Sequence, residues 1–121
     1  MVNTPQSPLI RWIPALLWAG WILRGSVDPS PDPPLFEIPH LDKIMHFVAW
    51  AILAALLRWA LGRAANLRRA FWVSWAIAFG YGLAIEALQA PIATRSAEGL
   101  DLLADALGAL LGAWLVGRRY P

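Results

Sequence analysis

The sequence contains no cysteine, so neither a disulfide framework nor a thiolate metal site is available to the protein. Charged residues are also scarce: Asp, Glu, Lys and Arg make up 15% of the 121 residues, where soluble domains have about 25%. Three familiar catalytic patterns are missing, since the chain has no His-Glu-x-x-His, no Gly-x-Ser-x-Gly and no phosphate-binding loop. These absences exclude thiol chemistry and give no support to the zinc protease, serine hydrolase and P-loop classes.

Apolar residues account for 59% of the chain and gather in four long segments. They predict an all-α polytopic membrane protein, one domain over residues 1–121 that forms a bundle of four transmembrane helices. We expect the spans at about 10–24, 43–61, 70–90 and 101–117. Only the third apolar run reaches the roughly 20 residues of a perpendicular span, so interfacial residues have to extend the first and the last. Five prolines in the segment 25–41 predict an irregular outer loop there.

Lysine and arginine are distributed unevenly over the predicted loops. Seven of them lie on one side of the membrane if the chain has four spans: Arg11, Arg58, Arg63, Arg68, Arg69, Arg118 and Arg119. The other side has Arg24, Lys43, Arg95 and all eight acidic residues. Because loops rich in Lys and Arg stay in the cytoplasm, we expect a multi-pass protein of the bacterial cytoplasmic membrane with both termini cytoplasmic. The arginines flank apolar segments, which indicates membrane anchoring and no nucleic-acid partner.

The first apolar segment also fits a signal peptide, because Arg11 precedes about a dozen apolar residues. Against this alternative, Arg24 stands where cleavage needs a small residue. Removal of the segment would also leave an odd number of spans.

Polar residues from three predicted spans gather at the predicted outer face. The set consists of Asp42, Lys43, His46, Glu86, Gln89, Arg95, Asp101 and Asp105. Asp42 and His46, Glu86 and Gln89, and Asp101 and Asp105 are three or four residues apart, so each pair shares one helix face, and Arg95 follows in a loop. His46, Glu86 and Asp105 lie about four residues inside their spans, which is roughly 6 Å deep. Ionisable groups at that depth are costly and face the bundle interior or a wet cavity, so we expect them to form a shared site.

The residue types indicate roles for this site. The catalytic candidates are His46, Glu86, Asp101 and Asp105, and the ligand-binding candidates are Asp42, Lys43, Gln89 and Arg95. The spacing does not choose between acid–base chemistry and binding of a divalent metal, so we assign no metal ligand and no cofactor. The N-terminal ends of the second and fourth spans also point outward, which favours an anionic ligand beside the basic side chains.

Most of these residues also have a purely structural explanation. Asp42 and Asp101 fit helix caps, and Lys43 and Arg95 fit side chains that reach the lipid headgroups. His46 fits an interior histidine with its hydrogen bonds satisfied, and Glu86 with Gln89 fits hydrogen bonding between helices. Two glycines, Gly108 and Gly112, continue the face of the fourth span and predict close helix packing. Whether that packing lies within one chain or between two chains of an oligomer is left open.

One ordered set of motifs resembles the VanZ-like family of bacterial membrane proteins: Asp42-Lys43-x-x-His46, Glu86-x-x-Gln89, Arg95 and Asp101-x-x-x-Asp105-x-x-Gly108-x-x-x-Gly112. The resemblance implies a small helical membrane protein. The founding member of the family is associated with resistance to the glycopeptide teicoplanin, and the family supplies no established catalytic residue. Asp105 departs from the pattern, because the family typically has asparagine there. This acid either adds negative charge to the site or stays protonated through desolvation.

Three functions remain open from the sequence. The first is binding or processing of an anionic cell-envelope lipid or lipid-linked precursor, with membrane lipids as partners. The second is an accessory or scaffold protein in which the same residues form a polar lock between helices. The third is a small transporter or proton pathway, which is weaker because we find no charge in the opposite half of any span to complete a path.

Overall fold

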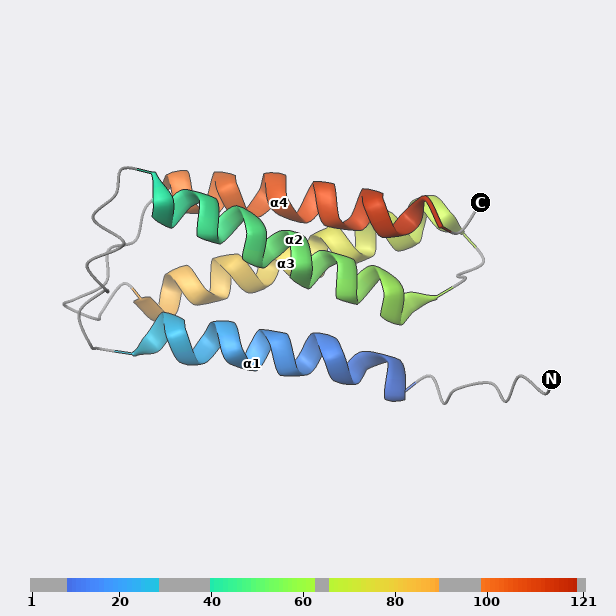
Figure 1. Ribbon diagram of the computed structural model, residues 1–121, viewed down its shortest axis with the longest axis horizontal. Helices are drawn as coiled ribbons and strands as arrows, with labels where there is room; N and C mark the ends of the chain where they lie inside the picture. The colour runs from blue at the N-terminus through green and yellow to red at the C-terminus, as the bar shows by residue number, and fades with distance from the viewer. Residues whose placement is uncertain (1–8, 29–39, 63–65, 90–98, 120–121) are drawn as a thin grey trace.

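The computed structural model describes residues 9–28, 40–62, 66–89 and 99–119. These residues form four α-helices and no strand: α1 (Ile13–Val27), α2 (Leu41–Leu61), α3 (Leu67–Gln89) and α4 (Gly99–Gly117), with a short 3-10 helix, η1 (Ile10–Trp12), before α1. Successive helices run in opposite directions, so α1 begins and α4 ends at the same end of the bundle (Figure 1). The predicted all-α bundle of four helices is therefore confirmed.

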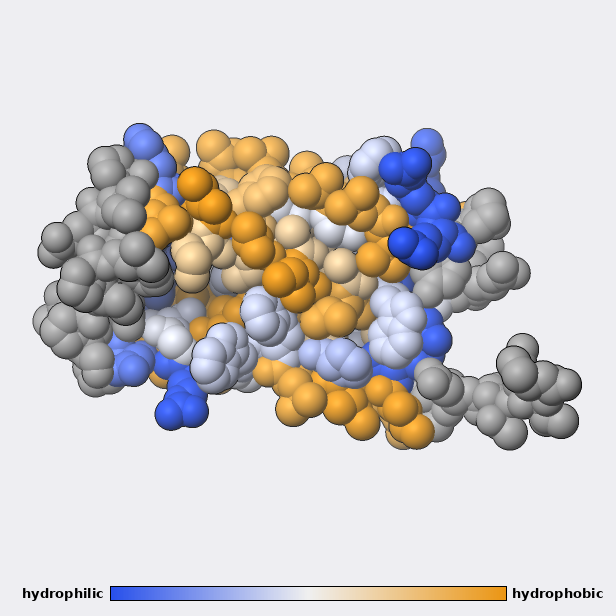
Figure 2. Space-filling model, in the orientation of Figure 1, coloured by the Kyte–Doolittle hydropathy of each residue, from blue (hydrophilic) through white to orange (hydrophobic). Residues whose placement is uncertain are grey.

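Three of the helices are long and apolar enough to cross a membrane: α2 with 21 residues, α3 with 23 and α4 with 19. Figure 2 shows a mainly apolar surface along the bundle and hydrophilic residues at its two ends, as expected of a protein surrounded by lipid. α1 has 15 residues and, with η1, covers roughly 27 Å at 1.5 Å per residue, close to the thickness of the hydrocarbon core. Its side chains Leu16, Leu17 and Trp21 are exposed, and we propose α1 as the fourth span.

The two ends of the bundle differ in charge. The polar end is the one where α2 and α4 begin, and the basic end is the opposite one (Figure 1). The described acidic residues all lie toward the polar end: Asp28, Asp42, Glu86, Asp101 and Asp105. The described basic residues of the basic end are Arg11, Arg58, Arg68, Arg69, Arg118 and Arg119. This separation matches the uneven distribution in the sequence.

Local signals explain where the helices begin and end. Pro14 lies in the first turn of α1, where a missing N–H leaves no bond unmade. α2 stops at Gly62, whose φ of 63° is easy for glycine alone. Asn66 caps α3 by accepting a hydrogen bond from the backbone N–H of Arg69 (3.1 Å). α1 continues to Val27, three residues beyond the predicted span, and residues 29–39 of the proline-rich segment lie outside the described part.

Aromatic side chains connect neighbouring helices by hydrogen bonds to backbone carbonyl oxygens. These bonds run from Trp18 Nε1 to Ala49 (2.9 Å), from Trp50 Nε1 to Ala78 (2.8 Å), from Trp75 Nε1 to Ala106 (3.0 Å) and from the Tyr81 hydroxyl to Ala19. They join α1 to α2, α2 to α3, α3 to α4 and α3 to α1. An indole N–H surrounded by lipid has no water to bond, so each bond satisfies a donor and fixes the distance between two helices.

The closest approach of two helices is between α2 and α4, and glycine makes it possible. A Cβ atom on Gly108 would overlap the carbonyl oxygen of Phe47, and one on Gly112 would overlap that of Ala51. Both glycines are buried. The Gly-x-x-x-Gly stripe therefore packs against a helix of the same chain, which the sequence had left open.

Candidate functional site at the polar end

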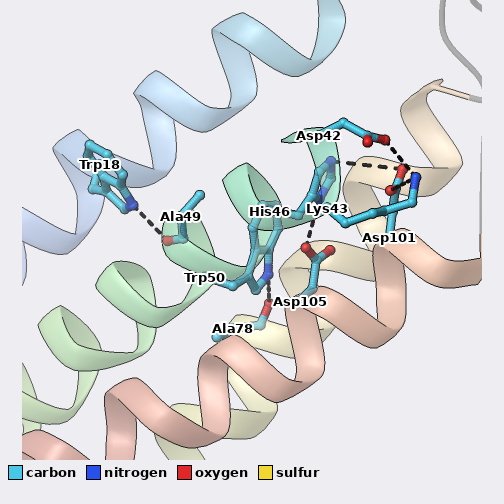
Figure 3. A network of polar contacts seen from close by, with 9 residues as sticks. All are labelled: Trp18, Asp42, Lys43, His46, Ala49, Trp50, Ala78, Asp101 and Asp105. Atoms are coloured by element: carbon cyan, nitrogen blue, oxygen red, sulfur yellow. Dashed lines mark hydrogen bonds and ion pairs between the residues drawn. The ribbon is translucent and has the colours of Figure 1, made fainter. Parts of the chain in front are cut away.

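Five of the predicted site residues meet between α2 and α4 at the polar end (Figure 3). They are Asp42, Lys43 and His46 of α2 and Asp101 and Asp105 of α4. The close backbone contact of the two helices positions them, because Phe47 follows His46 directly and Gly108 lies three residues after Asp105. Packing of the glycines thus brings opposite charges from two helices within contact distance.

Lys43 lies between two carboxylates. Its Nζ is 2.8 Å from Asp101 Oδ1 and 2.6 Å from Asp42 Oδ2. The side chain of Asp101 is 9% exposed, whereas that of Asp42 is 42% exposed. Ion pairs in contact with solvent contribute little to stability, whereas breaking a buried pair is costly. Asp101 is therefore the fixed partner of Lys43, and Asp42 is the exchangeable one.

His46 lies between the two acids of α4. Its Nδ1 is 2.8 Å from Asp105 Oδ1, and its Nε2 is 3.9 Å from Asp101 Oδ2. When the Asp105 carboxylate accepts the hydrogen bond, Nδ1 carries the proton and Nε2 is left as the basic nitrogen. The side chain of His46 is 23% exposed and that of Asp105 is 3% exposed. A partly accessible imidazole is thus held in place by a buried acid.

Two further residues shape the site and were not predicted from the sequence. The Trp50 ring is stacked on His46, with ring centres 5.6 Å apart and planes at 14°, while its Nε1 is bonded to the backbone of α3. A Cβ on Gly82 would lie 2.9 Å from Asp105 Oδ2 and 3.2 Å from Trp50 Nε1, so glycine there leaves room for the carboxylate. The spacing of four residues between His46 and Trp50 was a usable signal; nothing in the sequence singles out Gly82.

Of the other predicted residues, Gln89 is bonded to another helix and Arg95 lies outside the described chain. Gln89 is buried and donates a hydrogen bond from Nε2 to the carbonyl oxygen of Ser26 (3.2 Å), which ties α3 to α1. Glu86 is half-buried on α3, one turn beyond Gly82 toward the polar end. Arg95 lies outside the described residues. No group of three or more His, Asp and Glu side chains suited to a metal ion occurs within the described ranges.

Asp42 and Asp101 do not occupy the capping positions suggested by the sequence. The residue before α2 is His40, so Asp42 is the second residue of that helix, and Asp101 is the third residue of α4. Both acids still lie in a first turn, where a negative charge interacts favourably with the helix dipole. Their position leaves both carboxylates available to Lys43.

A charge is also buried in the basic half of the bundle, and this corrects the expectation that no such charge exists. Arg58 is 1% exposed, and its Nη1 donates a hydrogen bond to the carbonyl oxygen of Gly62 (2.8 Å). Its Nε is 3.6 Å from the place of a Cβ on Gly117, so the guanidinium lies between α2 and the end of α4. Arginine does not lose its proton in proteins, so Arg58 adds no step to a proton pathway.

Comparison with known proteins identifies the family. A family model described as VanZ/LLP1 matches residues 4–118, whereas the motifs of the sequence resemblance cover residues 42–112. The match therefore includes η1 and α1 as well as the three longer helices. No curated protein and no solved structure gave a significant match. The chain belongs to the VanZ/LLP1 family, as its VanZ-like motifs had predicted.

Proposed function

We propose that the protein binds a phosphate-bearing lipid or lipid-linked precursor of the cell envelope at its polar end, and that His46 exchanges a proton with this ligand. The observation that carries the proposal is the difference in exposure between His46, at 23%, and Asp105, at 3%. A histidine that serves only as a link between helices needs no accessible surface. A histidine that transfers a proton needs an accessible ring and a partner that fixes its orientation.

The phosphate contact is assigned to Lys43. Its outer partner, Asp42, is partly exposed, so exchange of this carboxylate for a phosphate costs little, about 0–1 kcal/mol. Asp101 stays in place and keeps the ammonium group oriented. α2 and α4 both begin at this end, and their N-terminal dipoles add a favourable potential for an anion.

The site is assigned to the outer face of the cytoplasmic membrane. The basic end, where α1 begins and α4 ends, has the arginines that favour the cytoplasm. With four crossings, both termini are then cytoplasmic and the polar end faces outward. A ligand from the outer leaflet reaches His46 and Lys43 without crossing the bilayer.

The proposal is tested by thermal unfolding of the purified protein with a polyprenyl phosphate and with the corresponding polyprenol. We expect the phosphate to stabilise the wild type by about 2.7 kcal/mol at 100 times the dissociation constant, and the alcohol to have little effect. Lys43→Met abolishes the difference between the two probes. Arg24→Gln keeps it, since Arg24 is an exposed basic residue at the same end but outside the network. Equal stabilisation by the alcohol, or an equal loss in Arg24→Gln, contradicts the proposal.

One observation favours a second candidate, a polar lock in an accessory or scaffold protein. The ion pair of Lys43 with Asp101 and the contact of His46 with Asp105 both join α2 to α4. If they act only as a lock, His46→Gln lowers the unfolding temperature and no lipid probe changes it. If the site binds a ligand, the phosphate probe raises the unfolding temperature of the wild type and does not raise that of His46→Gln.

The resistance phenotype of the family's founding member gives a cellular test. We propose that expression in a teicoplanin-susceptible bacterium raises the inhibitory concentration of teicoplanin through the polar-end site. His46→Gln should then lose the effect at unchanged abundance in the membrane. If this variant kept the full effect, resistance would not depend on the polar-end site.

A further inference from the structure

A groove lies between α2 and α4 on the side of the bundle toward the basic end. Small residues line it, Ala51 and Ala55 of α2 and Gly112 of α4, together with the larger apolar side chains of Ile52 and Leu115. Arg118 and Arg119 also line it and are exposed. The groove is therefore apolar along the two helices and positively charged where α4 ends.

The packing of the helices explains why a groove forms here. α2 and α4 touch through backbone at Gly108 and Gly112, and they separate toward the basic end (Figure 1). Past the last glycine contact, alanine side chains on α2 are too small to fill the widening space. The buried side chain of Arg58 occupies the interior near Gly117, so the remaining space is open to the surrounding lipid.

The two arginines hold fixed positions at the end of this groove. The backbone N–H of Arg118 bonds to Trp114 and that of Arg119 to Val116, so both residues continue the last turn of α4. The guanidinium of Arg118 lies 4.9 Å from the centre of the Trp114 ring. Exposed tryptophan favours the membrane–water interface, which places these positive charges at the level of the lipid headgroups.

We propose that the groove binds an anionic phospholipid of the leaflet at the basic end. One acyl chain lies along the small residues of α2 and α4, and the negatively charged headgroup contacts Arg118 and Arg119. Charge complementarity selects this occupant: an apolar channel accepts any acyl chain, but two arginines at its mouth favour a headgroup with net negative charge over a zwitterionic one. This site is separate from the polar end and does not depend on the function proposed there.

Native mass spectrometry of the full chain tests the inference. The protein is equilibrated with equal amounts of phosphatidylglycerol and phosphatidylcholine that have the same acyl chains, and the ratio of the two bound lipids is measured. Each basic side chain near an anionic headgroup contributes about a fivefold preference. We therefore expect the double variant R118Q/R119Q to lose roughly 25-fold in selectivity. The matched control is R68Q/R69Q, which removes two exposed arginines from the same end but away from the groove.

A second variant tests the apolar part of the site. Ala55→Leu fills the groove without changing charge, and we expect it to lower the amount of phosphatidylglycerol bound while thermal unfolding of the lipid-free protein stays near that of the wild type. No preference in the wild type overturns the inference, as does an equal loss in the two double-arginine variants. Unchanged binding in Ala55→Leu overturns the placement of the acyl chain. A complex of two protein copies in place of bound lipid assigns the groove to a second copy of the chain and also overturns it.

Discussion

Replacement of Asp105 separates the hydrogen bond in the polar-end network from the negative charge. Asp105→Asn keeps an oxygen that accepts from His46 Nδ1, at the site of the present 2.8 Å contact. Asp105→Ala removes that oxygen and leaves the imidazole N–H facing an empty space. The two variants therefore remove different parts of the same interaction.

The expected magnitudes follow from burial. Loss of one partner from a buried charged pair costs about 3–5 kcal/mol, and an unsatisfied buried group costs about 1–3 kcal/mol. Since His46 is 23% exposed and keeps some contact with water, we take the lower range and expect Asp105→Ala to cost about 2–3 kcal/mol of unfolding free energy. Asp105→Asn keeps the hydrogen bond and removes only the negative charge, so it should cost less, about 1 kcal/mol or below.

The assay is reversible unfolding in mixed micelles, followed by tryptophan fluorescence. Asp42→Ala is the control, because its partly exposed pair with Lys43 should contribute less than about 1 kcal/mol. A double-mutant cycle with His46→Gln isolates the pair and should give a coupling of about 1–2 kcal/mol. Equal costs for Asp105→Asn and Asp105→Ala would refute the reasoning, since the carboxylate charge would then matter more than the hydrogen bond. So would a coupling energy of zero.

Three further predictions concern packing and topology. Gly112→Ala forces α4 away from the backbone of α2 and should lower the unfolding free energy by about 1–3 kcal/mol. The control is Gly80→Ala, which has nothing within 4 Å of its Cβ and should be neutral or stabilising by up to about 1 kcal/mol. Similar costs at both positions would contradict the packing. Trp50→Phe keeps an aromatic ring beside the histidine but loses the indole bond to α3 (2.8 Å), so it should cost about 1 kcal/mol in the same unfolding assay, and an unchanged midpoint would show that the bond contributes nothing. Because the chain has no cysteine, a single introduced cysteine shows on which side of the membrane its position lies. In intact cells a membrane-impermeant maleimide should label Asp28→Cys and not Arg68→Cys. The reverse labelling pattern would show that the topology is inverted.

Much of the fold was predictable because lipid imposes simple rules on sequence. A helix surrounded by hydrocarbon must be long and apolar, and this made α2, α3 and α4 visible as uninterrupted runs. Ionisable residues inside such runs are rare, so His46, Glu86 and Asp105 stood out against their neighbours. Five of the eight polar residues singled out in the sequence do meet in the structure.

What remained unpredicted depends on which helix lies beside which. Glu86 and Gln89 share the spacing of the network residues, yet Gln89 is bonded to α1, because the rotation of α3 is set by the packing of the whole bundle. Burial of Arg58 likewise follows from the end of α4 passing over it at Gly117. Trp50 has a hydrophobic ring and a single polar atom, which donates a hydrogen bond to a backbone carbonyl of α3. The spacing of apolar residues along the sequence does not show which carbonyl lies beside this atom.

The central claim is that the polar end is a ligand site and not only a lock between α2 and α4. Its most direct test is native mass spectrometry of the wild type and of His46→Gln, purified from the same membranes, with thermal unfolding recorded beside it. The account predicts that the wild type retains a defined phosphate-bearing lipid or lipid-linked molecule, and that His46→Gln loses this molecule while losing no more stability than the about 1–2 kcal/mol expected for its contact with Asp105. If neither protein retains anything and His46→Gln unfolds earlier, the network is a structural lock and the proposed function is wrong.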